Sequence, residues 1–149
     1  MKILITGIAG FIGSNLVKEL FDPDNTIIGL DKMHSYSLKN HIHSYIVLDL
    51  SDDNINDICV DVDVVIHLAG ESSLDKHAGV YEKDTRLASE NLINSAISNK
   101  VKKVILLSTI KVHTSSQYSK QKLYIETLLK DKTESTATDY TIIRSASVY

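Results

Sequence analysis

The chain opens on the stretch that decides its fold, Met1-Lys2-Ile3-Leu4-Ile5-Thr6-Gly7-Ile8-Ala9-Gly10-Phe11-Ile12-Gly13. The apolar run from Ile3 to Ile5 predicts a buried strand, and three glycines follow it at regular intervals. The residues from Gly13 to Leu20 are typical of the start of a helix. A strand, a glycine turn and a helix N-terminus together form an anion site, because unpaired amides and aligned peptide dipoles face the ligand there.

Glycines suit this turn because a Cβ would collide with a bound pyrophosphate or with the strand beneath the helix. The spacing is G-x-x-G-x-x-G, whereas the more usual dinucleotide spacing is G-x-G-x-x-G. A secretory signal is the alternative, with Lys2 as its basic region and the apolar run as its core. The glycines inside the run, and the lack of an A-x-A-like site after it, favour the dinucleotide interpretation.

Composition limits the classes of function. The 149 residues suffice for one domain, and the apolar (43%) and charged (23%) fractions are ordinary for a soluble protein. A net charge of −3 gives no electrostatic reason to expect nucleic acid or an anionic membrane as partner. No apolar run approaches the roughly 18 residues of a membrane span. The single cysteine, Cys59, cannot form an internal disulfide, so we expect a cytoplasmic protein.

Strand-like and helix-like segments alternate along the chain. Further strands are predicted over 26–30, 44–48, 62–70, 101–107 and 139–144, and helices over 84–99 and 118–130. Residues 51–61 are predicted to form a turn or short helix in a solvated crossover. This alternation predicts a Rossmann-like α/β fold, a doubly wound parallel sheet with helices on both faces. Its ligand crevice lies at the carboxyl ends of the strands.

Acidic residues end two of the predicted strands. Asp31 lies 18 residues after Gly13, close to where a Rossmann unit places the acid that holds the adenosine ribose. Such a carboxylate repels a 2′-phosphate and favours NAD over NADP, although the adjacent Lys32 could accept that phosphate. Asp49 could bond the adenine amino group while Leu50 packs on the ring. Alternatively, Asp31 merely ends a strand and Asp49 caps the following turn.

Histidines gather in the polar segment 32–43, at positions 34, 41 and 43. No cysteine or acid completes a recognisable metal-ligand pattern with them, so a solvated loop is favoured and no metal is expected. His67 lies inside a predicted strand and is expected to be a core histidine with satisfied hydrogen bonds. The small residues Ala69 and Gly70 after that strand would let a cofactor pass close to the backbone.

The pattern Tyr118-Ser119-Lys120-Gln121-Lys122 falls on the predicted helix 118–130. Residues four apart share a helix face, so the Lys122 ammonium can approach the Tyr118 ring and the cofactor ribose. Lowering the pKa of a phenol from about 10 to about 7 requires about 4 kcal/mol of preferential stabilisation of the phenolate. The ammonium and a cationic nicotinamide have the right charge to supply much of it. Thr109, at the preceding strand end, could donate a hydrogen bond to the same substrate oxygen.

Tyrosine and lysine at this spacing also occur on ordinary solvated helix faces. Combined with the glycine turn, the acid at position 31 and the Ser108-Thr109 strand end, the pattern predicts an acid/base site. Its catalytic residues are Tyr118, Lys122 and Thr109.

In combination these motifs resemble the extended short-chain dehydrogenase/reductase family, the NAD-dependent sugar-nucleotide epimerases and dehydratases. The segment 6–13 resembles the family's TGxxGFxG, His67-Leu68-Ala69-Gly70 is similar to its H-x-A-A, and residues 118–122 match its YxxxK. Ser108-Thr109 corresponds to the Ser/Thr active-site segment, and residues 141–149 resemble the strand that carries xxRxxxVYG. The resemblance covers essentially the whole chain.

This resemblance implies an NAD cofactor, with NADP less favoured, and a nucleotide-sugar substrate. In that family a hydride moves between the nicotinamide and a sugar carbon while the tyrosine handles the hydroxyl proton. A homodimer paired through the helices near 84–99 and 118–130 is also implied. The implied cofactor-binding residues are Gly7, Gly10, Phe11, Ile12, Gly13, Asp31, Lys32, Asp49, Leu50, Leu68, Ala69, Gly70, Tyr118 and Lys122.

The sequence also departs from the family. Thr85 stands where the family usually has an asparagine before the long helix, and Ile110-Lys111 replaces the Asp-Glu pair of 4,6-dehydratases, which argues against dehydration. The loop from Thr109 to Tyr118 is shorter than usual. Family members continue beyond the position of Tyr149, so this chain is expected to be the cofactor-binding part without the C-terminal substrate part.

Two functions follow from these observations. The first is an epimerase or 4-keto-sugar reductase, present here as a fragment or shortened form. The second is a non-catalytic NAD-binding module that acts through dimerisation or a partner. A hydrolase has little support, because no G-x-S-x-G elbow occurs.

Overall fold

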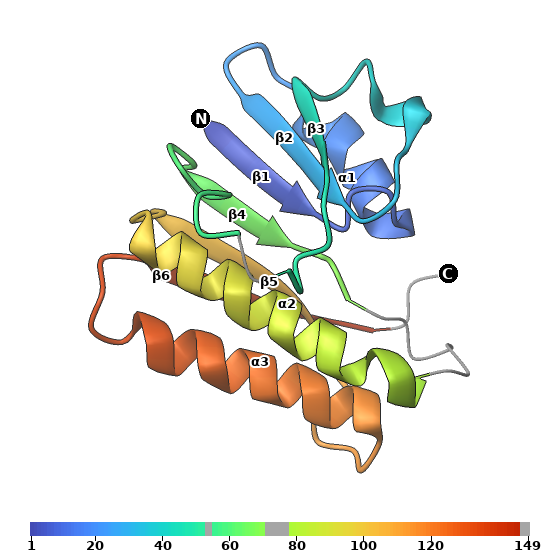
Figure 1. Cartoon of the computed structure of the whole chain (residues 1–149), viewed down its shortest axis with the longest axis vertical. Helices are drawn as coiled ribbons and strands as arrows, with labels where there is room; N and C mark the ends of the chain where they lie inside the picture. Colours follow the sequence, from blue (N-terminus) through green and yellow to red (C-terminus); the bar gives the residue numbers. More distant parts are fainter. Residues whose placement is uncertain (53–54, 71–77, 147–149) are drawn as a thin grey trace.

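The computed structural model describes residues 1–52, 55–70 and 78–146, and its architecture is the predicted Rossmann-like α/β fold. A 6-stranded parallel sheet has the order β3-β2-β1-β4-β5-β6 (Figure 1). The strands are β1 (Lys2–Thr6), β2 (Thr26–Asp31), β3 (Ser44–Val47), β4 (Val64–His67), β5 (Lys103–Thr109) and β6 (Asp139–Ser145). Residues 147–149, which end the segment resembling xxRxxxVYG, lie outside the described residues.

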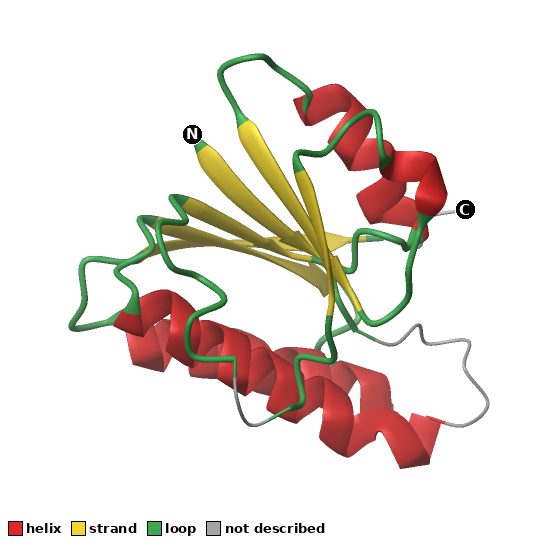
Figure 2. Ribbon diagram, turned by 45° about the horizontal axis from the view of Figure 1, so that its top comes forward, coloured by secondary structure: helices red, strands yellow, loops and turns green. Residues whose placement is uncertain are grey.

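Helices cover the two faces of the sheet unequally. Helix α1 (Phe11–Leu20) and the short 3-10 helix η1 (Tyr36–Leu38) lie on one face, near β1 to β3. Helices α2 (Ala78–Ser98) and α3 (Gln117–Thr133) lie side by side on the other face (Figure 2). No helix in the described parts of the chain combines the length and apolarity needed to cross a bilayer.

Element boundaries differ modestly from the predicted ones. Helix α1 begins at Phe11 rather than Gly13, and α2 begins at Ala78 rather than near Asp84. Strand β4 ends at His67 instead of continuing to Gly70, whose φ of 151° is incompatible with regular strand geometry.

The segment 51–61 between β3 and β4 is expected from the sequence to be only a solvated connection, and this expectation is wrong. The apolar side chains Leu50, Ile55, Cys59 and Val62 in and beside it are buried and join the core beneath α2 and α3. Burial raises the pKa of the Cys59 thiol to about 11, which makes it a core residue rather than a reactive one.

Alternation along the strands divides the core into two layers. Leu4 and Val65 face α2 and α3. They share one buried cluster with apolar residues of α2 such as Leu92 and Ile93. Their strand neighbours Ile3, Ile5 and Ile66 face α1, where Ile8, Val17 and Ile27 complete the second layer.

The sheet reverses its strand order at β1, which pairs with β2 on one side and β4 on the other. The crossovers from β1 and β4 therefore leave on opposite sides of the sheet. The carboxyl ends of these two strands lie side by side at this switch point, which is where doubly wound proteins bind ligands.

Candidate functional site

The glycine turn packs directly against the segment that follows β4. Gly7 has a φ of 70°, and a Cβ on it would lie 2.7 Å from the Ala69 nitrogen. A Cβ on Gly13 would lie 2.5 Å from the Gly7 oxygen and 2.7 Å from the Ile8 Cα. Close backbone packing therefore requires glycine at positions 7 and 13, whereas at Gly10 the nearest atom is 3.2 Å away.

The N-terminus of α1 lacks a side-chain cap. Its N-cap residue is Gly10, and its first turn contains no acidic residue. Phe11, the first helical residue, is 63% exposed beside this end of the helix, and Ile12 is partly buried. Uncapped amides and the helix dipole leave this position suited to an anion.

Asp31 lies at the end of β2 and contacts the glycine turn. Its Oδ2 accepts a hydrogen bond from the Ala9 amide at 3.0 Å, and its Oδ1 accepts one from the Met33 amide at 3.1 Å. The predicted ribose-binding acid and the predicted phosphate-binding turn are therefore joined in one site. The charge of the adjacent Lys32 reaches Asp49 and contributes to the lowered pKa of that carboxyl.

Asp49 and Leu50 have structural partners of their own. Asp49 Oδ1 accepts hydrogen bonds from the Ser51 amide at 2.9 Å and the Ser51 hydroxyl at 2.8 Å, and these bonds are the main cause of its lowered pKa. This is the turn-capping alternative considered from the sequence. Leu50 is buried in the core, so any contact of this pair with adenine stays a prediction.

The segment after β4 connects the glycine turn to α3. Leu68 and Ala69 are partly buried and Gly70 is exposed. A Cβ on Gly70 would lie 3.4 Å from Lys122 Nζ and 3.6 Å from a methyl carbon of Thr85. Thr85 lies within α2 rather than before it, so the expected position of the family's asparagine is wrong with respect to the helix start.

His67 is confirmed as a core histidine with both ring nitrogens satisfied. Its Nδ1 lies 2.7 Å from the Thr6 hydroxyl and its Nε2 lies 2.9 Å from the Ser89 hydroxyl. Ser89 donates to the Thr85 carbonyl, so it accepts from His67, and Nε2 carries the ring proton. Burial, and secondly the Lys122 charge, lower the pKa of His67 to about 3, so the ring is neutral.

Tyr118 and Lys122 lie on one face of α3, as their spacing predicts. The Lys122 Nζ is 5.9 Å from the centroid of the Tyr118 ring and donates a hydrogen bond to the Leu107 carbonyl at 3.2 Å. Lys122 is only 7% exposed, and burial lowers its pKa to about 8 while Glu126 opposes this shift. The structure therefore brings an ammonium, a phenol and the end of β5 together.

The expected lowering of the Tyr118 pKa is absent in the chain alone. Burial of the half-buried phenol raises its pKa instead. The ammonium is directed to the Leu107 carbonyl rather than to the phenol oxygen, which explains why it does not offset desolvation. In the chain alone, the Tyr118 pKa is therefore shifted upward, away from neutral pH.

Thr109 closes β5 and is nearly buried. Its Oγ1 accepts a hydrogen bond from the Lys111 amide at 3.2 Å. The hydroxyl proton is thus left to donate, as the predicted role requires.

Sequence reasoning missed Glu126, whose carboxylate lies one turn beyond Lys122 on the same helix face. It accepts hydrogen bonds from Ser108 Oγ at 2.5 Å and from Arg144 Nε at 3.0 Å and Nη2 at 2.7 Å. The spacing of Tyr118, Lys122 and Glu126 was the available signal, because positions i, i+4 and i+8 of a helix share one face.

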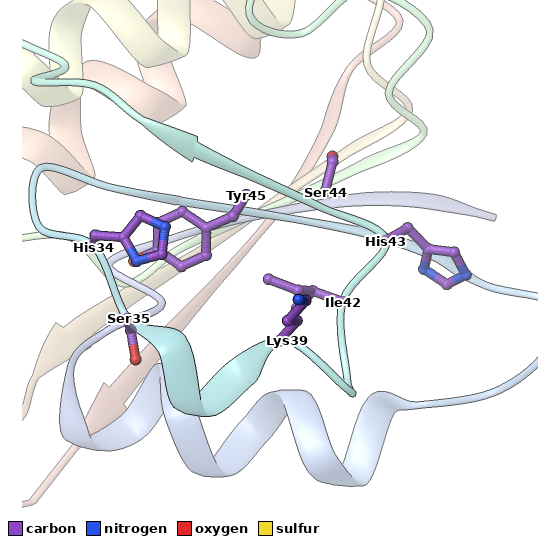
Figure 3. Close-up of a pocket in the computed structure, with 7 residues that line it drawn as sticks. All are labelled: His34, Ser35, Lys39, Ile42, His43, Ser44 and Tyr45. Carbon is purple, nitrogen blue, oxygen red and sulfur yellow. The ribbon is translucent and has the colours of Figure 1, made fainter.

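A cavity of about 410 Å³ lies apart from the predicted catalytic residues, at the crossover from β2 to β3 (Figure 3). The His34 ring stacks on Tyr45 with centroids 5.1 Å apart, and the Tyr45 hydroxyl donates to the Met33 carbonyl. Within the described residues no cluster of three metal-ligating side chains occurs. The cavity is lined by His34, Ser35, Lys39, Ile42, His43, Ser44 and Tyr45, none of them a predicted site residue.

Comparison with known proteins gives a consistent result. The family model described as "NAD dependent epimerase/dehydratase family" matches residues 3–149. Among curated proteins, the chain is 31% identical over 134 residues to the "Uncharacterized UDP-glucose epimerase YtcB" of Bacillus subtilis (strain 168), covering 78% of this chain and 42% of that protein.

Solved structures show the same likeness. A UDP-N-acetylglucosamine 4-epimerase from Methanobrevibacter ruminantium M1 superposes with a TM-score of 0.84 at 30% identity, covering 96% of this chain and 54% of that one. A UDP-glucuronic acid 4-epimerase from Bacillus cereus in complex with NAD superposes with a TM-score of 0.86 at 26% identity, covering 100% and 58%. The chain therefore spans about half the length of these solved relatives, and less of the curated one.

Proposed function

Because the chain belongs to the NAD-dependent epimerase/dehydratase family, we propose that it binds NAD and takes part in hydride transfer at a carbon of a nucleotide sugar. One observation carries this proposal. Backbone contacts run from Gly7 through Ala69, and Gly70 lies against the ammonium of Lys122, which neighbours Tyr118. These contacts support a diphosphate site and an acid/base pair close to the same segment after β4.

The cofactor site uses the glycine turn and the end of β2. Uncapped amides at the start of α1 bind the diphosphate, and the Asp31 carboxylate accepts hydrogen bonds from the adenosine ribose. This carboxylate also repels a 2′-phosphate, which favours NAD over NADP. Bound NAD supplies the hydride acceptor or donor and a positive charge beside Tyr118.

The protein residues manage the hydroxyl proton. As the sugar hydroxyl becomes a carbonyl, its proton passes to the Tyr118 oxygen, and in the reverse direction Tyr118 returns it. Together with the positive charge of bound NAD, the Lys122 ammonium stabilises the phenolate, and the Thr109 hydroxyl donates a hydrogen bond to the same sugar oxygen. Ile110 and Lys111 offer no acid for eliminating water, so epimerisation or reduction of a 4-keto sugar is preferred over dehydration.

Nicotinamide reduction by a panel of sugar nucleotides tests the proposal. We expect absorbance at the reduced nicotinamide band with at least one UDP- or dTDP-sugar and its loss in Tyr118→Phe. Tyr140→Phe, on β6, is the matched control and retains the signal. Failure of every sugar to reduce bound NAD would contradict catalysis by this chain.

A second candidate is a non-catalytic NAD-binding module, which would use the same cofactor site. NAD binding without turnover, unchanged by Tyr118→Phe, would support this alternative.

The proposal includes a homodimer formed through α2 and α3. These helices are coupled by the Tyr124 hydroxyl, which donates to Glu90, and by the Arg86 guanidinium, 4.0 Å from the Tyr124 ring centroid. Leu123 remains 37% exposed on α3. A monomeric mass in light scattering would refute the dimer.

A further inference from the structure

Glu126 is a buried carboxylate with no assigned part in the site. It lies on α3 one turn after Lys122 and two turns after Tyr118, and it is only 1% exposed. Burying a carboxylate is costly unless several hydrogen bonds and an opposite charge compensate it. An explanation is therefore needed for a charge at this position.

The partners of Glu126 come from both strands next to α3. Ser108 of β5 donates to Oε1 at 2.5 Å, while Arg144 of β6 donates to both carboxylate oxygens at 3.0 and 2.7 Å. The Arg144 side chain remains 38% exposed, so the carboxylate is the buried member of the pair. Fork-like pairing of this kind fixes orientation as well as distance.

Ser108 lies between the two residues of β5 that serve the site. Its predecessor Leu107 accepts the hydrogen bond from Lys122 Nζ, and its successor Thr109 carries the hydroxyl expected to contact substrate. Ser145 of β6 also donates to the Ser108 carbonyl at 3.3 Å. Holding Ser108 therefore fixes the positions of both neighbours relative to α3.

Charge adds a second effect of the same residue. Among the described groups, Lys122 is faced by Tyr118 and Glu126 on its own helix and by the neutral His67 of β4. Glu126 is the acid among these groups, and its charge raises the Lys122 pKa against the effect of burial. It therefore helps to keep the ammonium protonated beside the phenol.

We propose that Glu126 is a positioning residue, which acts through Ser108 to hold the Thr109 strand end in register with the Tyr118–Lys122 face of α3. A role for Glu126 in turnover rests on the proposed function. Its role in aligning the end of β5 with α3 does not depend on that function. Arg144 compensates the carboxylate so that it can remain ionised at this depth.

NMR on the whole chain tests the register and charge without needing activity. With lysine labelled at Cε, Glu126→Gln is expected to lower the Lys122 pKa, because the carboxylate that raises it is removed. The amide resonances of Leu107 and Thr109 are expected to shift as well. Glu90→Gln, which neutralises an α2 carboxylate bonded to Tyr124, is the matched control and leaves all three signals in place.

Ser108→Ala provides a second variant, because Glu126→Gln could fail to fold with Arg144 left unpaired. It keeps the Glu126–Arg144 pair and removes only the link to β5, so the Thr109 amide is expected to shift while the Lys122 pKa holds. Unmoved Leu107 and Thr109 resonances in this variant would overturn the proposal.

An activity arm separates the proposal from the function on which it rests. If the wild type reduces NAD with a sugar nucleotide, Ser108→Ala is expected to lower kcat by about 10- to 100-fold with little change in KM. An unchanged kcat would overturn the positioning role. If the wild type shows no turnover, the proposed catalytic function is contradicted. The NMR measurements then still test whether Glu126 and Ser108 fix the position of the β5 end relative to α3.

Discussion

The Nζ atom of Lys122 donates a hydrogen bond to the Leu107 carbonyl at a distance of 3.2 Å, and the Lys122 side chain is buried. An ammonium held at this depth costs folding free energy, and this cost is one reason why we propose a functional rather than a stabilising role for Lys122. Its charge lies 5.9 Å from the centroid of the Tyr118 ring, which is the proposed acid/base group.

Lys122→Met is expected to stabilise the fold at pH 7 while weakening NAD binding. The Lys122 pKa is about 8 in the folded chain against an ordinary value of 10.5, so the ammonium opposes folding below pH 8. The penalty disappears as pH rises from 8 to 10.5. We expect a gain of about 1–3 kcal/mol in the free energy of urea unfolding at pH 7.

Lys120→Met, at an exposed position of the same helix, is the control and should change stability little. If Lys122→Met is less stable than the wild type at pH 7, the buried ammonium does not lower the free energy of unfolding, and this explanation is wrong.

His67 should make the chain sensitive to mild acid. Its folded pKa of about 3 lies below the ordinary 6.5, so its stabilising effect is complete above pH 6.5 and is lost as pH falls toward 3. Between pH 6 and 5 the unfolding free energy should fall by up to about 1.4 kcal/mol per pH unit from this residue.

His67→Gln should lose stability at pH 7, because its bonds to Thr6 and Ser89 are disturbed, but its pH slope over that window should be shallower. The exposed His113→Gln is the control. Equal slopes for wild type and His67→Gln would show that this ring is not the titrating group.

Gly10→Ala should separate cofactor binding from folding. Its Cβ would meet only the Gly7 oxygen, at 3.2 Å, so stability should change by less than about 1 kcal/mol, whereas a bound diphosphate would lose close approach to the turn. Gly13→Ala is the contrasting variant, since its Cβ would lie 2.5 Å from a backbone oxygen and should cost about 1–3 kcal/mol. Thermal unfolding and NAD titration measure the two effects. Wild-type NAD affinity in Gly10→Ala would argue against a diphosphate at this turn.

Asp31→Asn should shift cofactor preference. The amide oxygen can keep one acceptor for the Ala9 or Met33 amide, but the negative charge that repels a 2′-phosphate is lost. We expect weaker NAD binding and a ratio of NADP to NAD affinity about tenfold higher, measured by calorimetry. A ratio identical to that of the wild type would place the adenosine ribose elsewhere.

Much of the fold could be predicted because strand alternation and glycine spacing are local signals. The apolar runs identified every strand of the sheet, and the Tyr118–Lys122 spacing placed both side chains on one helix face. Long-range pairings could not be read in this way. The Glu126 bonds to Ser108 and Arg144 depend on how β5, β6 and α3 pack, and no sequence spacing connects these residues.

The pKa of Tyr118 shows the same limit at the site. The sequence gives the sign of a neighbouring charge, whereas the degree of burial and the direction of the Lys122 hydrogen bond arise only in the folded chain. Likewise, the aspartate-rich crossover gave no sign that Ile55 and Cys59 would be buried beneath α2.

The most direct measurement is a set of intermolecular NOEs between NAD and the chain labelled at tyrosine and glycine. We expect contacts from the nicotinamide protons to the Tyr118 ring, together with amide shifts at Gly7, Gly10 and Gly13 on titration. Absence of binding, or contacts confined to the cavity beside Tyr45, would contradict it.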